Sequence, residues 1–398
     1  MLNDSFRLGR LRGISIGVHW SVLFIAGLLA WGLATRILPT AAAGQPAAAY
    51  WAAGILVAGM FFVSLLAHEL AHAFFAVRAG VRVEGITLWL LGGVARLDGD
   101  APTPGHDLRI AASGPIVSGL LGIGFGGLAI WLSSAGVAPL VAESATWLAR
   151  VNLLLAVFNL LPGAPLDGGR IVRSIAWRLG RDRLRAALVA TRIGRALGFG
   201  MVAFGMLELV VGADLGGIWT IVIGLFLTGA AAAERDSELA RDALGGLLVR
   251  DVMAPEPVRV PAGITADLFA DSILAGSGQS AALAVEPGGE VLGVVGLREA
   301  SALRGGQRRE ARIRDITVPL ASVPVTRPDE PVLEAFERTA TSGPAVRGPR
   351  GAYLLVVDDG AIVGIVSGDD LARTVAAHGI AVARGRAAIP SPEGPSQQ

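Results

Sequence analysis

The sequence predicts a polytopic α-helical membrane protein that continues into a C-terminal soluble α/β module. Of its 398 residues, 53% are hydrophobic and only 17% are charged, a balance typical of membrane proteins. Long apolar runs fill the first part of the chain, and acidic and basic residues become frequent after Glu234. We therefore expect a membrane domain over residues 1–234, a linker over 235–248, a soluble module over 249–376 and a disordered tail over 377–398.

Six segments are apolar enough to cross a bilayer as helices, which requires about 20 residues each. The expected spans are Ile14–Leu38, Tyr50–Val77, Asp107–Leu132, Ala145–Leu161, Ile193–Val211 and Leu215–Ala233. Arginines gather before the first span and after the even-numbered ones, and this bias places both termini in the cytoplasm. The Arg-rich stretch 170–195 is either an amphipathic surface helix or an extension of the fifth span.

The segment Val81–Leu97 is predicted to be a β-hairpin rather than a span. Ile86, Leu88 and Leu90 alternate with Thr87, Trp89 and Leu91, and Gly92-Gly93 then supplies a turn. Its apolar character suggests that the hairpin is associated with the membrane domain, where non-helical backbone requires cover from protein or a water-filled cavity. An ordinary cytosolic hairpin is the alternative.

The motif His68-Glu69-Leu70-Ala71-His72 lies within the second expected span. On a helix, this spacing puts two imidazoles one turn apart on one face, where both can bind a metal. The Glu between them can act as general base toward a metal-bound water. A chance match on a soluble core helix is the alternative, but ionisable residues inside a span usually indicate function.

A catalytic zinc site usually has three protein ligands, and the third candidate here is Asp167. The chain has no cysteine, so the ligands of any metal must be histidines and carboxylates. Asp167 follows the cytosolic end of the fourth span, on the same side as His72. Prolines and glycines break the helix before it, which lets the backbone turn toward the other spans.

Together, these motifs resemble those of the site-2 protease family of intramembrane zinc metalloproteases, in its prokaryotic six-span branch. The second motif is Asn159-Leu160-Leu161-Pro162, followed after four intervening residues by Asp167-Gly168. The resemblance implies one Zn²⁺ per chain, held by His68, His72 and Asp167, with Glu69 as general base. It also implies that Asn159 helps to bind substrate or to stabilise the oxyanion; a buried amide that bonds between helices is the alternative.

The family resemblance extends to the cellular setting. It implies a prokaryotic plasma membrane, contact with membrane lipid, and single-span substrates such as anti-sigma factors or membrane-tethered transcription factors. Gly114-Pro115 resembles the family's Gly-Pro segment, whereas Ser118 stands where an Asn is common and receives no role. The hairpin that ends at Gly92-Gly93 resembles the family's membrane-inserted sheet, which holds substrate as an added strand.

The soluble module contains an internal repeat. Val258–Phe269 aligns with Val325–Phe336, and Leu292–Val295 aligns with Val363–Val366. The two copies resemble a tandem pair of cystathionine-β-synthase (CBS) domains.

That resemblance implies nucleotide binding at Ser367 and Asp370 in the second copy, with ATP, ADP or AMP as ligand. The first copy has Gly296 and Glu299 at the equivalent positions, which puts its site in doubt. A purely structural module that forms a homodimer is the alternative.

A different class of protein fits some of these features. A membrane transporter or channel with a regulatory CBS pair would also have six spans and polar residues within them. It would not explain a Glu between two His at metalloprotease spacing, and the spans show no internal repeat. A net charge of +1 gives no indication of nucleic-acid binding. His19, His106 and His378 lack a partner at ligand spacing and are not expected to bind the metal.

Overall fold

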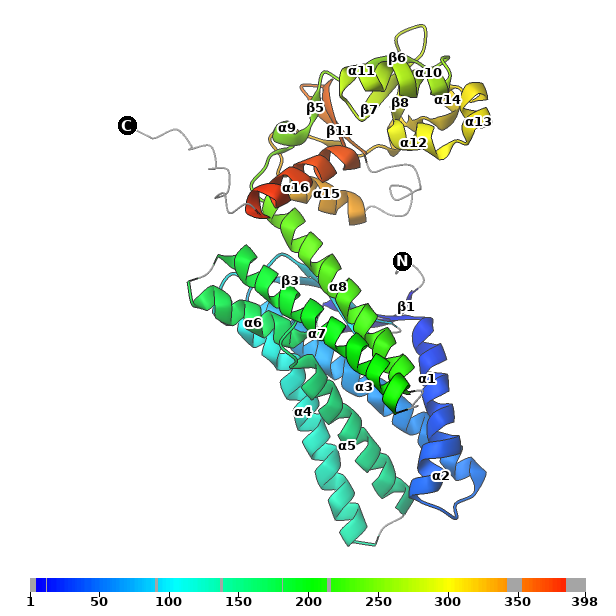
Figure 1. Ribbon diagram of the computed structural model, residues 1–398, viewed down its shortest axis with the longest axis vertical. Coiled ribbons are helices and arrows are strands. Elements are labelled where there is room, and N and C mark those ends of the chain that lie inside the picture. Colours follow the sequence, from blue (N-terminus) through cyan, green and yellow to red (C-terminus); the bar gives the residue numbers. More distant parts are fainter. Residues whose placement is uncertain are drawn as a thin grey trace. The chain divides into compact units, whose positions relative to one another are not determined.

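The computed structural model describes residues 5–11, 13–89, 92–136, 139–180, 182–212, 216–341 and 353–383. Within these residues the chain forms two compact units, Met1–Asp236 and Ser237–Gln398 (Figure 1). The first unit is helical with one small sheet, and the second is the α/β module.

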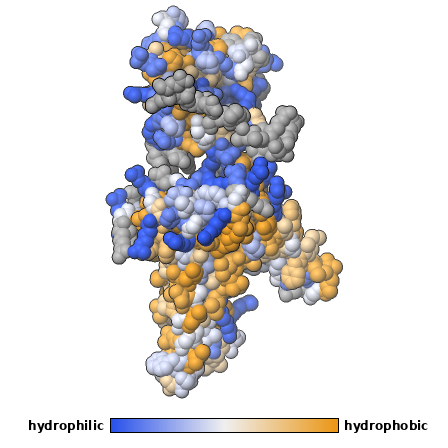
Figure 2. All heavy atoms as spheres, turned by 90° about the vertical axis from the view of Figure 1, so that its left-hand side faces the viewer, coloured by the Kyte–Doolittle hydropathy of each residue, from blue (hydrophilic) through white to orange (hydrophobic). Residues whose placement is uncertain are grey.

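Six helical segments in the described part of the chain are long and apolar enough to span a membrane, as predicted. The first is Ser21–Ala41, which comprises α1 (Ser21–Gly32), a π-helical turn (Leu33–Ile37) and α2 (Leu38–Ala41). The others are α3 (Ala47–Arg78), α4 (Pro104–Ser134), α5 (Pro139–Asn159), α7 (Arg183–Val211) and α8 (Gly216–Leu244). Large apolar side chains on these helices face outward, and Figure 2 shows them on one face of the molecule. Apolar side chains that face outward along long helices are typical of a surface in contact with lipid. The chain is a multi-pass membrane protein.

Several predicted boundaries were wrong. The first span begins at Ser21, because Ile14–His19 forms strand β2. The Arg-rich stretch is divided between the short helix α6 (Asp167–Arg178) and the beginning of α7. Helix α8 continues through most of the expected linker, to Leu244. The last helix, α16, extends to Ala383, seven residues into the expected tail; residues 384–398 lie outside the described part of the chain.

A four-stranded sheet accompanies the helices of the first unit. Its order is β1-β2-β3-β4, and β2 pairs parallel to β3. The strands are β1 (Ser5–Leu11), β2 (Ile14–His19), β3 (Arg82–Trp89) and β4 (Gly92–Asp98). The predicted hairpin is therefore confirmed as β3 and β4, which pair antiparallel. Gly92 and Gly93 open β4 rather than forming the turn, and β4 has a free edge in the described structure.

The α/β unit consists of two four-stranded sheets with the same topology, which confirms the repeat. The first has the order β6-β7-β8-β9 and the second β10-β11-β12-β5. Each sheet takes its last strand from the segment that precedes the other copy, so the two copies are interlocked. Gly293 in the first copy pairs with Pro319, and the equivalent Gly364 pairs with Pro255.

The elements of this unit are short. Its strands are β5 (Ala254–Pro255), β6 (Arg259–Pro261), β7 (Ala281–Val285), β8 (Val291–Gly296), β9 (Val318–Pro319), β10 (Val325–Thr326), β11 (Tyr353–Asp358) and β12 (Ala361–Ser367). Its helices are α9 (Val249–Val252), α10 (Ala266–Leu268), a π-helical turn (Phe269–Leu274), α11 (Ala275–Ser277), α12 (Leu297–Ala302), α13 (Gly305–Glu310), α14 (Ile313–Ile316), a 3₁₀ turn (Leu320–Ser322), α15 (Val332–Thr341) and α16 (Gly368–Ala383).

Candidate metal centre

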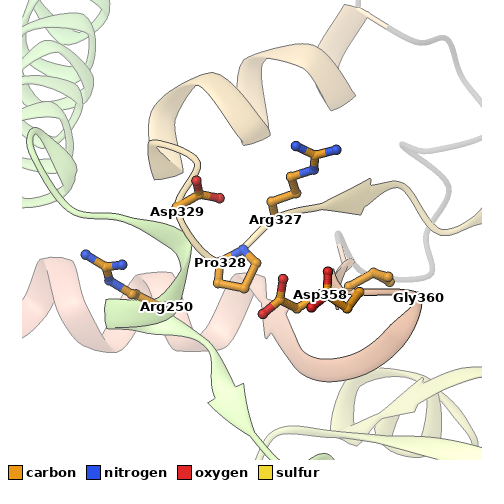
Figure 3. A pocket seen from close by; sticks show the side chains of 8 residues that line it. Arg250, Arg327, Pro328, Asp329, Asp358 and Gly360 are labelled. Carbon is orange, nitrogen blue, oxygen red and sulfur yellow. The ribbon is translucent and has the colours of Figure 1, made fainter.

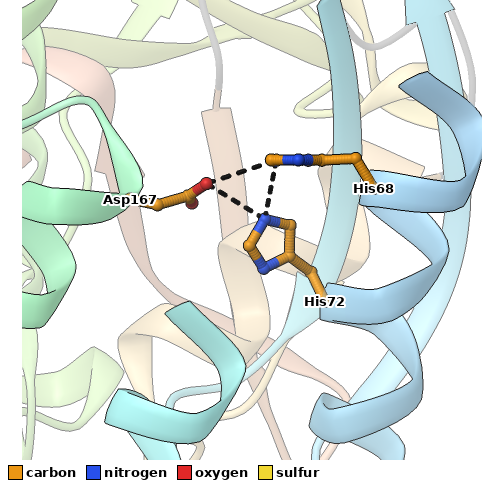
Figure 4. A group of neighbouring side chains, drawn as sticks. All are labelled: His68, His72 and Asp167. Carbon is orange, nitrogen blue, oxygen red and sulfur yellow. Dashed lines mark hydrogen bonds and ion pairs between the residues drawn. The ribbon is translucent and has the colours of Figure 1, made fainter. Parts of the chain in front are cut away.

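Helix α3 and the first turn of α6 bring the three predicted ligands together (Figure 4). The Nε2 atoms of His68 and His72 lie 3.1 Å apart. One carboxylate oxygen of Asp167, Oδ2, lies 3.2 Å from each of them. The two histidines are buried, and this oxygen has no hydrogen-bond donor in the described structure. Three potential ligand atoms thus point at one another.

Helix α4 orients the two imidazoles through their other nitrogens. The Nδ1 atom of His72 donates to the carbonyl oxygen of Ile110 at 2.7 Å, and since a carbonyl only accepts, the proton is on Nδ1. The Nδ1 atom of His68 lies 2.9 Å from the hydroxyl of Ser118, which is fully buried. Bonds of this kind fix the ring orientation of metal-binding histidines and leave Nε2 for the metal. Neither of these two partners was predicted from the sequence.

The site fits a zinc ion by its distances and by its space. Tetrahedral zinc with ligands at 2.0–2.2 Å separates neighbouring ligand atoms by about 3.4 Å, close to the distances among these three atoms. A Cβ atom on Gly114 of α4 would lie 2.3 Å from Nε2 of His72 and 2.6 Å from Nε2 of His68. The absence of a side chain at Gly114 therefore keeps the space beside both nitrogens open.

The loop that carries Asp167 is held by close backbone packing. The amide of Ala164 donates to the carbonyl oxygen of Ala190 in α7 at 3.1 Å. A Cβ on Gly194 would lie 1.9 Å from the oxygen of Ala164, and one on Gly168 would lie 2.2 Å from the oxygen of Leu161. Only glycine permits these approaches, which explains why glycines surround the carboxylate ligand in this sequence.

Glu69 lies against strand β4. A Cβ on Gly93 would be 2.2 Å from Cγ of Glu69 and 2.8 Å from its Oε1. The backbone at the beginning of β4 therefore packs directly on the side chain predicted to be the general base. Because β4 is an edge strand, this contact brings a free sheet edge next to the candidate centre.

The remaining predicted residues of the first unit lie apart from this cluster. The side-chain amide of Asn159 donates to the carbonyl oxygen of Leu155 in its own helix at 3.0 Å. This hydrogen bond stays within α5, whereas the alternative for Asn159 was a buried amide that bonds between helices. His19 bonds Ser21, and His106 bonds Thr103 at the beginning of α4. In the second unit, His378 pairs with Asp242. None of the three joins the metal-ligand group among the described residues.

In the α/β unit, Ser367 and Asp370 are buried at the junction between β12 and α16. The carboxylate of Asp370 accepts from the amide and the hydroxyl of Ser367 at 2.8 and 2.7 Å. Ser280 of the first copy reaches across to the same carboxylate at 3.1 Å. Arg373 forms an ion pair with it as well.

The equivalent place in the first copy is filled by a tyrosine. Glu299 accepts from the amide of Gly296 at 3.0 Å and from the hydroxyl of Tyr353. A Cβ on Gly296 would lie 2.2 Å from that hydroxyl. Burial, together with the hydrogen bond to Glu299, raises the pKa of Tyr353 well above its ordinary value, so the hydroxyl keeps its proton and donates it.

A polar pocket of about 550 Å³ lies at the other end of the second sheet (Figure 3). Ser367 pairs with Tyr353 at one end of the β11–β12 hairpin, whereas the pocket surrounds the turn at Asp358 and Gly360. Its wall also includes Arg250 and Arg327. It is therefore separate from the predicted nucleotide position.

The comparison with known proteins agrees with the geometry. Residues 56–141 and 128–201 match Peptidase family M50, and residues 313–377 match the CBS domain. The chain is 43% identical to the zinc metalloprotease Rip3 of Mycobacterium tuberculosis over 380 residues, which are 96% of this chain and 95% of that protein. It is 27% identical over 376 residues to the zinc metalloprotease MJ0392 of Methanocaldococcus jannaschii, which covers 94% of this chain and 97% of that protein.

A solved structure is also similar, the site-2 protease from Methanocaldococcus jannaschii. It is 31% identical and covers 58% of this chain and 95% of its own, with a TM-score of 0.39. Sequence identity to Rip3 over nearly the whole chain, joined to the family match, shows that this protein belongs to the M50, site-2-protease-like family of zinc metalloproteases.

Proposed function

We propose that this zinc metalloprotease hydrolyses a peptide bond within or near the transmembrane segment of a single-span membrane protein. One observation carries the proposal. His68, His72 and Asp167 converge within 3.2 Å of one another, and two of them lie on a helix long and apolar enough to span the membrane. Glu69 comes from the same turns of that helix, so the acid-base group lies beside the metal ligands.

The proposed chemistry divides between the metal and the protein. Bound zinc would lower the pKa of a coordinated water and polarise the scissile carbonyl. His68, His72 and Asp167 would hold it, with Ser118 and the Ile110 carbonyl fixing the rings. Glu69 takes a proton from the attacking water at its carboxylate and delivers it to the leaving amine. Asn159 is proposed to bind the substrate backbone or the developing oxyanion.

Substrate presentation follows from the position of β4. A transmembrane helix must unwind before its peptide bonds are accessible, and an extended segment can then pair with a sheet edge. The second residue of β4, Gly93, packs against Glu69. A substrate strand added there would pass its backbone beside the base. We propose anti-sigma factors and membrane-tethered transcription factors as the substrate class.

The arginine distribution supports an orientation in the plasma membrane of a prokaryotic cell. Both termini would be cytoplasmic, surrounded at the spans by membrane lipid. The metal ligands of α3 lie in the last third of that helix, nearer its cytoplasmic end, where water can enter. The CBS pair would then be cytoplasmic, and we propose that it binds ATP, ADP or AMP at Ser367 and Asp370 and contributes to a homodimer.

The test has two measurements. One is cleavage of a co-expressed single-span model substrate, and the other is the zinc content of the purified protein. Glu69→Gln is expected to keep zinc and to lose cleavage, by the 10²–10⁴-fold or so that a general base contributes. His68→Ala and Asp167→Ala are expected to lose zinc as well as cleavage. Full activity in Glu69→Gln would show that the base is wrongly assigned, and full zinc content in both ligand variants would remove the proposed site.

A further inference from the structure

Asp107, in the first turn of α4, is a buried carboxylate whose described partners all come from α6. It is 1% exposed. The guanidinium of Arg173 donates to it at 2.8, 3.0 and 3.1 Å, and the hydroxyl of Ser174 donates at 2.8 Å. Arg170 adds a longer bond at 3.3 Å. Arg173 is itself only 9% exposed, so this is a desolvated ion pair with a bidentate fork.

Helix α6 also carries the carboxylate ligand. Asp167 is its first residue, and Arg170 and Ser174 follow at positions three and seven residues later. At that helical spacing, these side chains share one face. Two of the bonds to Asp107, those of Arg170 and Ser174, therefore come from the face of α6 that directs Asp167 toward the imidazoles, and Arg173 adds its bonds from the next turn position.

Helix α4 provides the other half of the arrangement. One turn after Asp107, the carbonyl oxygen of Ile110 receives Nδ1 of His72, and Ser118 contacts Nδ1 of His68 further along the same helix. Contacts with α4 thus position all three predicted ligands. The two histidines are bonded to α4 directly, and Asp167 is connected to it through the ion pair of α6.

We propose that Asp107, Arg173 and Ser174 form a positioning latch that sets Asp167 at bonding distance from the zinc. A buried ion pair adds little net stability compared with apolar side chains of similar volume, because desolvation offsets the attraction. Its bidentate geometry does fix the rotation and the height of one helix against the other. Metal–ligand distances in proteins stay within about 0.2 Å of their standard values. The position that the ion pair gives to Asp167 is therefore more important than the free energy that the pair contributes. The inference rests on the proposed zinc protease.

The test measures zinc retention by the full-length protein in detergent micelles. The variants are Asp107→Asn, Arg173→Gln and the double variant Asp107→Asn/Arg173→Gln, which removes both charges of the buried pair. Loss of zinc to an excess of a chelator is followed in time, beside thermal unfolding of the zinc-free protein. The matched controls are Asp100→Asn and Arg183→Gln, which remove an ion pair of 2.6 Å that does not involve α6.

The double variant is expected to lose zinc about 10-fold or more faster than wild type, the size of effect typical of groups that orient metal ligands. Its zinc-free unfolding temperature should stay within the range of the two controls, which should retain zinc as wild type does. Asp107→Glu, which keeps the negative charge beside Arg173, should retain zinc better than Asp107→Asn does. Substrate titration should show a lowered kcat with an unchanged KM.

Two results would overturn the latch. One is wild-type zinc retention in the double variant, and the other is zinc loss that follows the unfolding temperature equally in the double variant and the controls. Either leaves the proposed function intact as long as the wild type binds zinc and cleaves substrate. A wild type that neither binds zinc nor cleaves would instead contradict the proposed function itself.

Discussion

Gly114 shows how much of the metal centre depends on a missing side chain. An added Cβ would lie 2.3 Å from the Nε2 atom of His72, closer than any non-bonded contact allows. We expect Gly114→Ala to displace at least one imidazole and to lose most of its zinc, measured by metal analysis of the purified protein. Gly119→Ala is the matched control on the same helix, because a Cβ there meets nothing within 4 Å. Equal zinc content in the two variants would contradict this account.

The metal ligands themselves could be predicted from the sequence, but the residues that orient them could not. The pairing of His68 with His72 follows from helical spacing alone, and Asp167 followed from its depth and its broken helix. The partners of the imidazoles did not follow, because the contacts of Ser118 and the Ile110 carbonyl join helices that are far apart in the sequence. For Asp107, the sequence offers only a weak indication of a buried ion pair, namely an acidic residue at the beginning of a span.

Among the elements, strand β4 links the sheet to the chemistry. Its Gly93 packs on the Glu69 side chain with no room for a Cβ. We expect Gly93→Ala to move Glu69 without touching the zinc ligands. Zinc content should stay at the wild-type level, while kcat for a single-span substrate falls by about 10-fold or more, within the 10²–10⁴-fold total contributed by a general base.

A peptide-bond cleavage assay with parallel zinc analysis would separate this effect from a loss of metal. Gly119→Ala again serves as the control, with both quantities expected at wild-type levels. If Gly93→Ala lost zinc in parallel with activity, β4 would support the ligands rather than the base, and the proposed place of the substrate strand beside Glu69 would no longer follow.

Strand β2 was wrongly assigned to the first span, because its alternating pattern runs directly into the apolar sequence of a helix. Ile14, Ile16 and Val18 alternate with Ser15, Gly17 and His19, the pattern of a strand with one apolar face. They run without a charged residue into the apolar helix that follows, so a criterion of length and apolarity joined them to the span. Their pairing with β3, which lies more than sixty residues later, was not accessible from local pattern.

At the scale of the whole molecule, the two CBS copies share a topology but differ at the position where a nucleotide is proposed to bind. Tyr353 of the second copy occupies the space above Gly296 and bonds Glu299 of the first. At the second copy's position, the contact from the other copy is the small hydroxyl of Ser280, which bonds Ser367 and Asp370. A ligand hydroxyl could replace Ser280 with little rearrangement, whereas it would have to expel a buried phenol from the first copy.

The asymmetry predicts a single nucleotide per chain, bound by the second copy. Calorimetric titration of the full-length protein with ATP, ADP and AMP should give one site. Asp370→Asn should abolish the heat, because the carboxylate would accept from the ribose hydroxyls. Glu299→Gln should leave both the heat and the stoichiometry unchanged, since its side chain is already committed to Tyr353. Heat that survives in Asp370→Asn but disappears in Glu299→Gln would assign the site to the first copy. The absence of heat in the wild type with all three nucleotides would favour a structural dimerisation module.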